Sequence, residues 1–161
     1  MSKRSKSQGA KAGGDIATNR QARFRFHLLE TFEAGIALQG SEVKSARDGK
    51  VNLKDSFAVV RDAEVWLYNT HIAPYAPAAG DGHDPERPRK LLLHKREILR
   101  LIGKTAEKGL TLVPVRMYFS GAHVKVELAL AKGKELGDKR ETIRAREQQR
   151  EVQRALRDSE R

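Results

Sequence analysis

The stretch LTLVPVRMYFSGAHVKVELAL, residues 110–130, decides the fold class of this chain. In its second half, from Val124 to Leu130, the large apolar residues occupy every other position, and Lys125 and Glu127 stand between them. A period of two is typical of a half-buried β-strand. Ser120-Gly121 separates this run from the apolar run that begins at Leu110, which predicts a hairpin of two antiparallel strands.

Similar short runs lie on the N-terminal side of this hairpin. Phe24 to Leu28 and Phe32 to Leu38 alternate in the same way and predict one long, bent strand or two consecutive strands. Residues 57–60 and 65–68 flank residues 61–64 and predict a second hairpin, and residues 71–75 form another short candidate strand. Six or more strands that mostly follow one another favour a small antiparallel barrel, because closure removes exposed sheet edges.

Two or three short helices are expected around this barrel. One follows Gly40 and runs from a Ser41 cap to Arg47, and another starts after His94, which has Glu97 at capping-box spacing. Ile98, Leu99, Leu101 and Ile102 would give the second helix an apolar face. A further short helical turn is expected between Gly103 and Gly109.

The segment between the second hairpin and this helix is expected to be a loop that ends at a buried strand. Residues 74–88 contain four of the five prolines, which predicts a long loop. The apolar run 91–93 that follows is expected to be buried.

The positive charge is concentrated at the two ends of the chain. Residues 1–26 hold seven Lys or Arg and one acid, and residues 132–161 hold ten and seven. The 105 residues between them contribute only +2 of the net charge of +11. We expect a disordered basic N-terminus (1–15), a barrel domain (16–131) and a basic tail (132–161). Basic ends on a nearly neutral centre favour a polyanionic partner such as a nucleic acid.

The tail after residue 131 has few large apolar residues, so it cannot fold alone and is expected to be disordered when free. It is rich in helix-forming residues, and at about 100° per residue its cations lie within about 80° of one another on a helix. This basic stripe contains Lys139, Arg146, Arg150, Arg154, Arg157 and Arg161. The tail is either a solvated charged helix or a segment that becomes helical along a phosphate-lined channel.

Several enzyme classes find no support in the sequence. The chain has no cysteine, and its five histidines share no metal-site spacing. It contains no phosphate-binding loop, zinc-protease motif or serine-nucleophile motif. No apolar run approaches the length of a membrane span, and the N-terminus has no apolar signal region. We expect a cytoplasmic protein with no catalytic residues, no metal and no cofactor.

Candidate RNA-binding residues are dispersed along the chain, as recognition of RNA by its shape would require. They are Arg20 and Arg23 beside Asn19 before the first strand, Lys44 and Arg47 one helical turn apart, Arg87, Arg89 and Lys90 around the end of the long loop, and Lys132 and Lys134 after the last strand.

One long stretch, FEAGIALQGSEVKSARDGKVNLKDSF from Phe32 to Phe57, resembles the bacterial SsrA-binding protein (small protein B) family. Further blocks resemble it in the same order: EVWLYNTHIAPY (64–75), HDPERPRKLLLHKREI (83–98), EKGLTLVPVRMYF (107–119) and VKVELALAKGKELGDKRE (124–141). The resemblance implies an oligonucleotide-binding-type barrel that acts as a monomer. It also implies binding to the tRNA-like domain of transfer-messenger RNA and its delivery to stalled ribosomes for trans-translation.

The resemblance also implies roles for particular residues. Glu33, Leu92 and His94 match positions where the family contacts the tRNA-like domain. Asp138, Lys139 and Arg140 match its DKR motif, which implies that the tail enters the decoding centre and messenger channel of the small ribosomal subunit.

Alternatives remain for these residues and for the whole protein. Glu33 could pair only with a neighbouring Lys, Leu92 could belong to the core, and His94 could be only a helix cap. A structural ribosomal or ribosome-assembly protein would fit the basic ends and the barrel equally well. An RNA-directed barrel enzyme is disfavoured, since no acid–base or metal constellation is visible.

Overall fold

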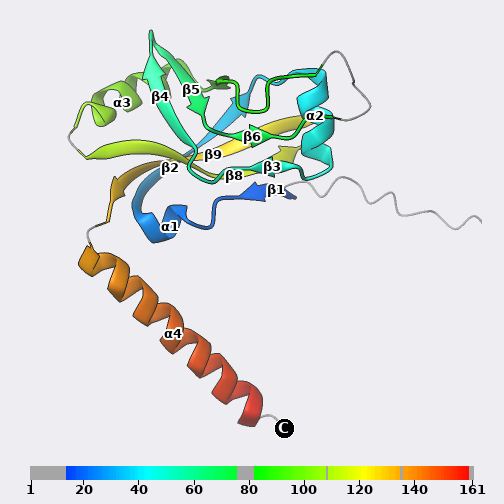
Figure 1. Ribbon diagram of the computed structural model, residues 1–161. Coiled ribbons are helices and arrows are strands. Elements are labelled where there is room, and N and C mark those ends of the chain that lie inside the picture. The colour runs from blue at the N-terminus through cyan, green and yellow to red at the C-terminus, as the bar shows by residue number, and fades with distance from the viewer. Residues whose placement is uncertain (1–13, 76–81, 108, 135, 160–161) are drawn as a thin grey trace, which may run out of the picture.

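Six antiparallel strands close into a barrel in the described part of the chain (Figure 1). The computed structural model describes residues 14–75, 82–107, 109–134 and 136–159, with the backbone alone for residues 136–138. The strand order around the barrel is β8, β4, β5, β7, β2 and β9, and β9 pairs again with β8. These strands are β2 (Phe26–Ile36), β4 (Phe57–Arg61), β5 (Glu64–Tyr68), β7 (Arg89–Leu92), β8 (Leu110–Ser120) and β9 (His123–Gly133). The predicted small antiparallel barrel is confirmed.

The remaining elements surround this barrel. β1 (Asp15–Thr18) pairs with one end of β8, and β3 (Val51–Asn52) pairs with β6 (His71–Ile72) in a separate two-stranded sheet. The helices are α1 (Ala22–Arg25), α2 (Gly40–Arg47), α3 (Lys95–Thr105) and α4 (Leu136–Ser159).

The predicted hairpin of β8 and β9 is also confirmed, and Gly121 in its turn has a positive φ of 60°. Such a φ favours glycine, which lacks the Cβ that would clash. Pro114 has no N–H to donate to the ladder, and the register shifts between Pro114 and Arg116. This bulge leaves two carbonyls available, and Asn19 binds both: its backbone N donates to Val115 O (2.7 Å) and its Nδ2 to Pro114 O (3.0 Å).

The barrel interior contains the apolar face of β9 that the alternation predicts. Val124, Val126, Leu128 and Leu130 are all buried. A second buried cluster, which the alternation did not predict, lies on the outer face of β8 and β9. It contains Ala22, Val113, Val115, Ala129 and Ala131. The small side chains of Ala129 and Ala131 allow α1 to approach the barrel wall closely.

Several local expectations near β2 and α2 were wrong. The strand expected from Phe24 begins at Phe26, because residues 22–25 form α1. The strand ends at Ile36 instead of at Leu38, and α2 begins at Gly40 instead of after it. Gln39 caps α2 instead of Ser41, and its backbone N–H donates to Glu42 Oε2 at 2.8 Å.

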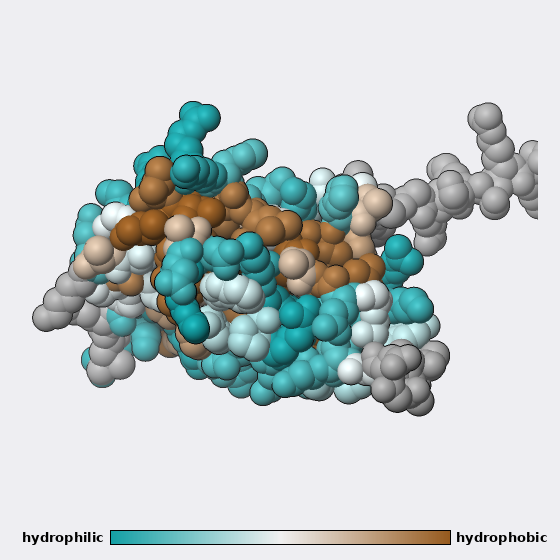
Figure 2. All heavy atoms as spheres, turned by 90° about the horizontal axis from the view of Figure 1, so that it is seen from above, coloured by the Kyte–Doolittle hydropathy of each residue, from teal (hydrophilic) through white to brown (hydrophobic). Residues whose placement is uncertain are grey.

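The apolar face of α3 is only partly buried. Leu101 is buried, whereas Leu99 and Ile102 are exposed and Ile98 packs at the edge of the core. The separate turn expected after Gly103 is absent from the described residues, because α3 continues through Gly103 to Thr105. Figure 2 shows apolar side chains gathered in a band on the face seen from above, the side on which β4, β5 and α3 lie in Figure 1.

The tail projects from the barrel as the single long helix α4 (Figure 1). It begins three residues after β9, which ends at Gly133 instead of at the expected residue 131. Val152 and Leu156 are about 60% exposed (58% and 60%), so the helix has no packed face there. Helical structure is as expected for this sequence, and a transition from a disordered to a helical tail stays a prediction.

Candidate nucleic-acid interface

An open hollow of about 330 Å³ on the outside of the barrel gathers three of the predicted site residues. It is lined by Glu33 from β2, Leu92 and Leu93 at the end of β7, His94 and Glu97 at the start of α3, and Lys125 from β9. The β2–β7 ladder brings these segments together, because Gly35 lies opposite Leu92. A Cβ on Gly35 would lie only 3.3 Å from Leu92 Cβ, so glycine permits this close approach.

Leu92 faces solvent at the end of β7. Its side chain is 53% exposed, while Leu91 is 1% exposed. Successive side chains of a strand point to opposite faces, so the three leucines cannot share one face. The expectation that residues 91–93 are all buried was therefore wrong for Leu92, and so was its alternative role in the core. Leu92 is available to cover a nucleobase.

His94 occupies the N-cap position of α3, as its spacing to Glu97 predicts. Its exposed side chain makes no capping hydrogen bond, so the expected capping box is wrong. Glu97 Oε2 is buried in the hollow without a hydrogen-bond partner among the described residues. The hollow thus offers an exposed imidazole to a ligand, whereas the unpaired oxygen of Glu97 is buried in its wall.

Glu33 is the exposed acidic residue of this hollow, and its side chain is 60% exposed. The hydroxyl of Tyr118 donates to Glu33 Oε2 at 2.6 Å, and Lys125 Nζ lies 3.8 Å from Oε1. The suggested ion pair with a neighbouring lysine is therefore present, but the distance between the two charged groups is long. Sequence reasoning missed Tyr118, Lys125 and Glu97, since no local pattern connects these residues to Glu33.

Arg89 and Arg87 both make internal contacts to Glu42, but Arg87 is partly exposed and its RNA contact stays a prediction. Arg89 is fully buried, and it donates to Glu42 Oε1 at 2.8 Å and to Thr70 O at 2.7 Å. Arg87 forms two bonds to the same carboxylate, of 2.8 Å and 2.7 Å. The expected RNA contact is wrong for Arg89, because no atom of it reaches the surface.

Glu42 is the buried acid that holds both arginines. Burial alone raises the pKa of the Glu42 carboxyl, but hydrogen bonds from Arg87, the Gln39 backbone and Arg89 outweigh it and lower that pKa from its usual value. The two arginines and Glu42 thus tie the end of the long loop to α2.

His83, just before these arginines, is also buried in an internal contact. Its ring lies 2.8 Å from Ser41 Oγ and 2.9 Å from Ile72 O. The side chain of Asp84 accepts a hydrogen bond from Glu86 N at 3.0 Å, and this bond stabilises the turn that begins at Asp84.

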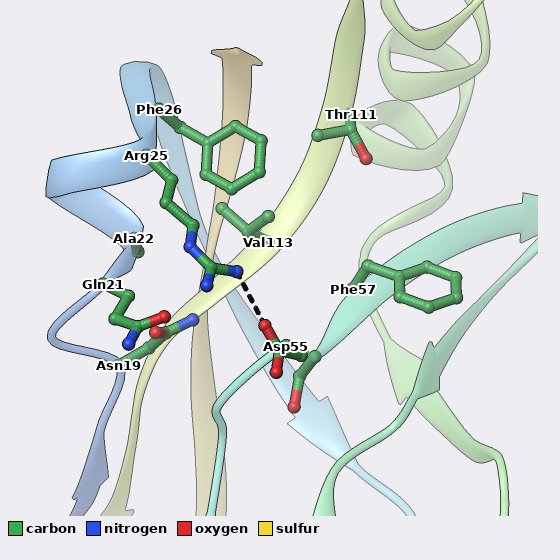
Figure 3. A pocket seen from close by; sticks show the side chains of 10 residues that line it. Asn19, Gln21, Ala22, Arg25, Phe26, Asp55, Phe57, Thr111 and Val113 are labelled. Atoms are coloured by element: carbon green, nitrogen blue, oxygen red, sulfur yellow. Dashed lines mark hydrogen bonds and ion pairs between the residues drawn. The ribbon is translucent and has the colours of Figure 1, made fainter. Parts of the chain in front are cut away.

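A second hollow, of about 190 Å³, lies beside Asn19 at the α1 end of the barrel (Figure 3). Asn19 is only 9% exposed and anchors the chain to the β8 bulge, which gives it a structural role, and its RNA contact stays a prediction. Arg20 and Arg23 next to it are exposed. Figure 3 shows Arg25 and Asp55 pointing toward one another across this hollow, where they form an ion pair of 2.7 Å.

The other predicted cations lie at separate places on the surface. Lys44 is exposed on α2 with its Nζ 5.4 Å from the centre of the Tyr75 ring, and Arg47 is exposed one turn later. Lys90 pairs with Glu64 at 2.8 Å. Lys132 is exposed, and Lys134 Nζ donates to Arg23 O at 2.8 Å.

The predicted tail residues lie along α4. Arg140, Arg146, Arg150, Arg154 and Arg157 are exposed, and Lys139 is partly buried. Arg146 also lies over the Phe24 ring of α1, 5.8 Å from its centre. The side chain of Asp138 and all of Arg161 lie outside the described residues.

Comparison with known proteins places this barrel in a family. A family model described as SmpB protein matches residues 16–158, which span the barrel and nearly all of α4. The chain belongs to this family. Within the described residues no group of three or more His, Asp or Glu side chains could hold a metal ion, and no helix there is long and apolar enough to cross a membrane.

Curated members of the family are similar over most of their length. The SsrA-binding protein of Carboxydothermus hydrogenoformans is 59% identical over 142 residues, which cover 88% of this chain and 95% of the relative. That of Trichodesmium erythraeum is 60% identical over 143 residues, covering 88% and 91%. A solved structure described as "tmRNA-SmpB: a journey to the center of the bacterial ribosome" contains a chain with 53% identity and a TM-score of 0.64. The match covers 74% of this chain and 85% of that one.

Proposed function

We propose that this protein binds the tRNA-like domain of transfer-messenger RNA and delivers it to stalled ribosomes for trans-translation. The observation that carries the proposal is the assembly of Glu33, Leu92 and His94 in one hollow of the barrel. These are the three positions at which the family resemblance implies contact with the RNA. Family membership and the names of the relatives support the same function.

The hollow suits a splayed nucleobase better than a phosphate. Glu33 and Glu97 repel phosphate, and the exposed carboxylate of Glu33 accepts hydrogen bonds from the amino or imino groups of a base. Leu92 covers the face of the base with its apolar side chain, and His94 stacks or donates. Lys125 supplies a positive charge for the adjacent phosphate, which positions the RNA backbone without reading its sequence.

The tail has a different role on the ribosome. Its exposed cations lie along a helix that projects from the barrel, and this arrangement can follow a channel lined with RNA phosphates. We assign Asp138, Lys139 and Arg140 to the decoding centre and the later arginines to the messenger channel of the small subunit. The alanyl-charged RNA then takes over the stalled peptide, and the protein itself forms no covalent bond.

A binding titration against the tRNA-like fragment, with excess ordinary tRNA as competitor, tests this function. It is run at two salt concentrations, because the salt slope reports the number of phosphate contacts. Binding that survives the competitor supports the escort function. Binding that disappears, together with stoichiometric sedimentation with ribosomes that lack transfer-messenger RNA, would favour a structural ribosomal protein instead.

Two glutamate variants test whether Glu33 contributes to RNA binding by its position or only by its negative charge. The side chains of Glu33 and Glu107 are both 60% exposed, and each lies near one lysine. Glu33→Ala should weaken binding of the fragment without unfolding the barrel, whereas Glu107→Ala should leave the affinity unchanged. Equal affinity of the two variants would remove Glu33 from the RNA site.

A further inference from the structure

Tyr118 lies behind the RNA-facing carboxylate of Glu33. It is only 7% exposed on β8, and its hydroxyl donates to Glu33 Oε2 at 2.6 Å. This distance lies within the range of an O–H···O bond to a carboxylate, which is stronger than a bond between two neutral groups. Glu33 therefore has one oxygen held by a buried side chain of β8, and its other oxygen faces Lys125 at 3.8 Å.

The ring of Tyr118 is itself held in place by Arg116. The two residues lie two apart on β8, so their side chains share one face of the strand. The guanidinium carbon of Arg116 lies 4.3 Å from the ring centre, within the range of a cation–π contact. Arg116 is clamped in turn by Glu127 Oε2 at 2.6 Å and Asp15 Oδ1 at 2.7 Å.

Strand pairing creates this chain of contacts from three separate parts of the sequence. Glu127 lies opposite both Glu33 on β2 and Arg116 on β8, and Asp15 of β1 lies opposite Tyr118. Arg116 thus has two carboxylate partners besides the ring. Its hydrogen bonds go to these two carboxylates, which leaves the carboxylate of Glu33 to the neutral hydroxyl of Tyr118.

We propose that Tyr118 is a positioning residue of the RNA site, which fixes the exposed Glu33 carboxylate in the orientation that accepts a nucleobase. The inference rests on the function proposed above. An exposed glutamate must lose rotamer freedom when it binds. A side chain already fixed in its bound orientation avoids that loss, which increases affinity. A neutral donor achieves this without cancelling the negative charge that selects a base over a phosphate.

The test compares two tyrosine-to-phenylalanine variants in the full-length chain. Tyr118→Phe removes the hydroxyl and keeps the ring beneath Arg116. Tyr68→Phe is the matched control, because Tyr68 stacks on Phe57 in the β4–β5 hairpin and does not contact Glu33 in the described structure. We expect Tyr118→Phe to weaken binding of the tRNA-like fragment about three- to tenfold, the range of the net contribution of one ordinary hydrogen bond, and Tyr68→Phe to have no effect.

A double-mutant cycle separates positioning from a general effect on the fold. In a Glu33→Ala background, Tyr118→Phe should cause no further loss of affinity, because the carboxylate that it positions is gone. Thermal unfolding of each variant sets a temperature at which all of them are folded for the titration.

Two results would overturn the proposal. One is wild-type affinity of Tyr118→Phe, and the other is an equal loss in the presence and absence of Glu33. Failure of the underlying function would look different, since the wild-type protein would then lose the fragment to competing tRNA.

Discussion

Replacing Glu42 by alanine should strongly destabilise the barrel without changing the residues that line the hollow of Glu33. The Glu42 carboxylate is fully buried, and it accepts hydrogen bonds from Arg87, Arg89 and the backbone of Gln39. Its removal leaves the buried Arg89 guanidinium with backbone carbonyls as its only acceptors in the described structure. They are those of Thr70, Asp84 and Pro85.

The expected magnitude follows from this burial. Removing one partner of a buried ion pair costs about 3–5 kcal/mol, because the other charge stays buried without compensation. Domains of this kind unfold with a free energy of about 5–15 kcal/mol, so the change removes a large part of the stability. At about 3 °C per kcal/mol for a chain of this length, the melting temperature should fall by about 10 °C or more.

Urea unfolding followed by the fluorescence of Trp66, the one tryptophan of the chain, measures the free energy of unfolding. Glu64→Ala is the matched control. Glu64 also pairs with a cation at 2.8 Å, but both side chains of that pair are about 40% exposed (39% and 41%). A surface pair contributes about 0–1 kcal/mol. A similarly small loss of unfolding free energy in the two variants would refute the conclusion that the buried Glu42 carboxylate stabilises the fold.

Three further predictions concern the RNA site, the tail and the response to pH. Leu92→Ala should weaken fragment binding by about 1 kcal/mol, the value of a partly buried apolar contact. It should change the free energy of unfolding by less than about 0.5 kcal/mol, because Leu92 is exposed. A large loss of unfolding free energy in a urea titration would contradict this prediction. Truncation after Lys134 keeps all of β9, so a titration should find the RNA affinity largely intact. Peptide tagging on stalled ribosomes should be lost. A truncated protein that still tags peptides would exclude the proposed role of the tail. Burial and the bond to Glu33 raise the pKa of Tyr118 from 10.0 to about 12, so the stability linked to it should be complete below pH 10 and decline as the pH rises toward 12. In Glu33→Ala the titration of the Tyr118 ring, followed by NMR, should shift to lower pH, and an unshifted titration would argue against the bond.

Local patterns predicted much of the barrel. The alternation in β9 and the turn at Gly121 involve neighbouring residues, so the hairpin of β8 and β9 could be recognised without knowledge of the rest of the chain. The helical composition and basic stripe of residues 136–159 are local in the same sense. The family resemblance added the identity of Glu33, Leu92 and His94 as site residues, but not their arrangement.

Element boundaries were less predictable because they depend on tertiary contacts. Ala22 is buried against β8 and β9, which favours a turn of helix where alternation alone suggested strand. Gln39 caps α2 because the side chain of Glu42 is held within reach of the Gln39 backbone N–H.

Residue type and position in the sequence established the antiparallel strands, the charged ends and the helical tail of this protein, since each depends on near neighbours. Only the tertiary structure decided which side chains of β7 face inward. Leu92 is exposed and Arg89 is buried, the reverse of what hydrophobicity suggests, because strand alternation turns Leu92 outward and Glu42, distant in sequence, compensates the buried charge of Arg89. The contact of Tyr118 with Glu33 likewise exists only because β9 pairs with both β2 and β8, which brings together two residues 85 positions apart in the sequence.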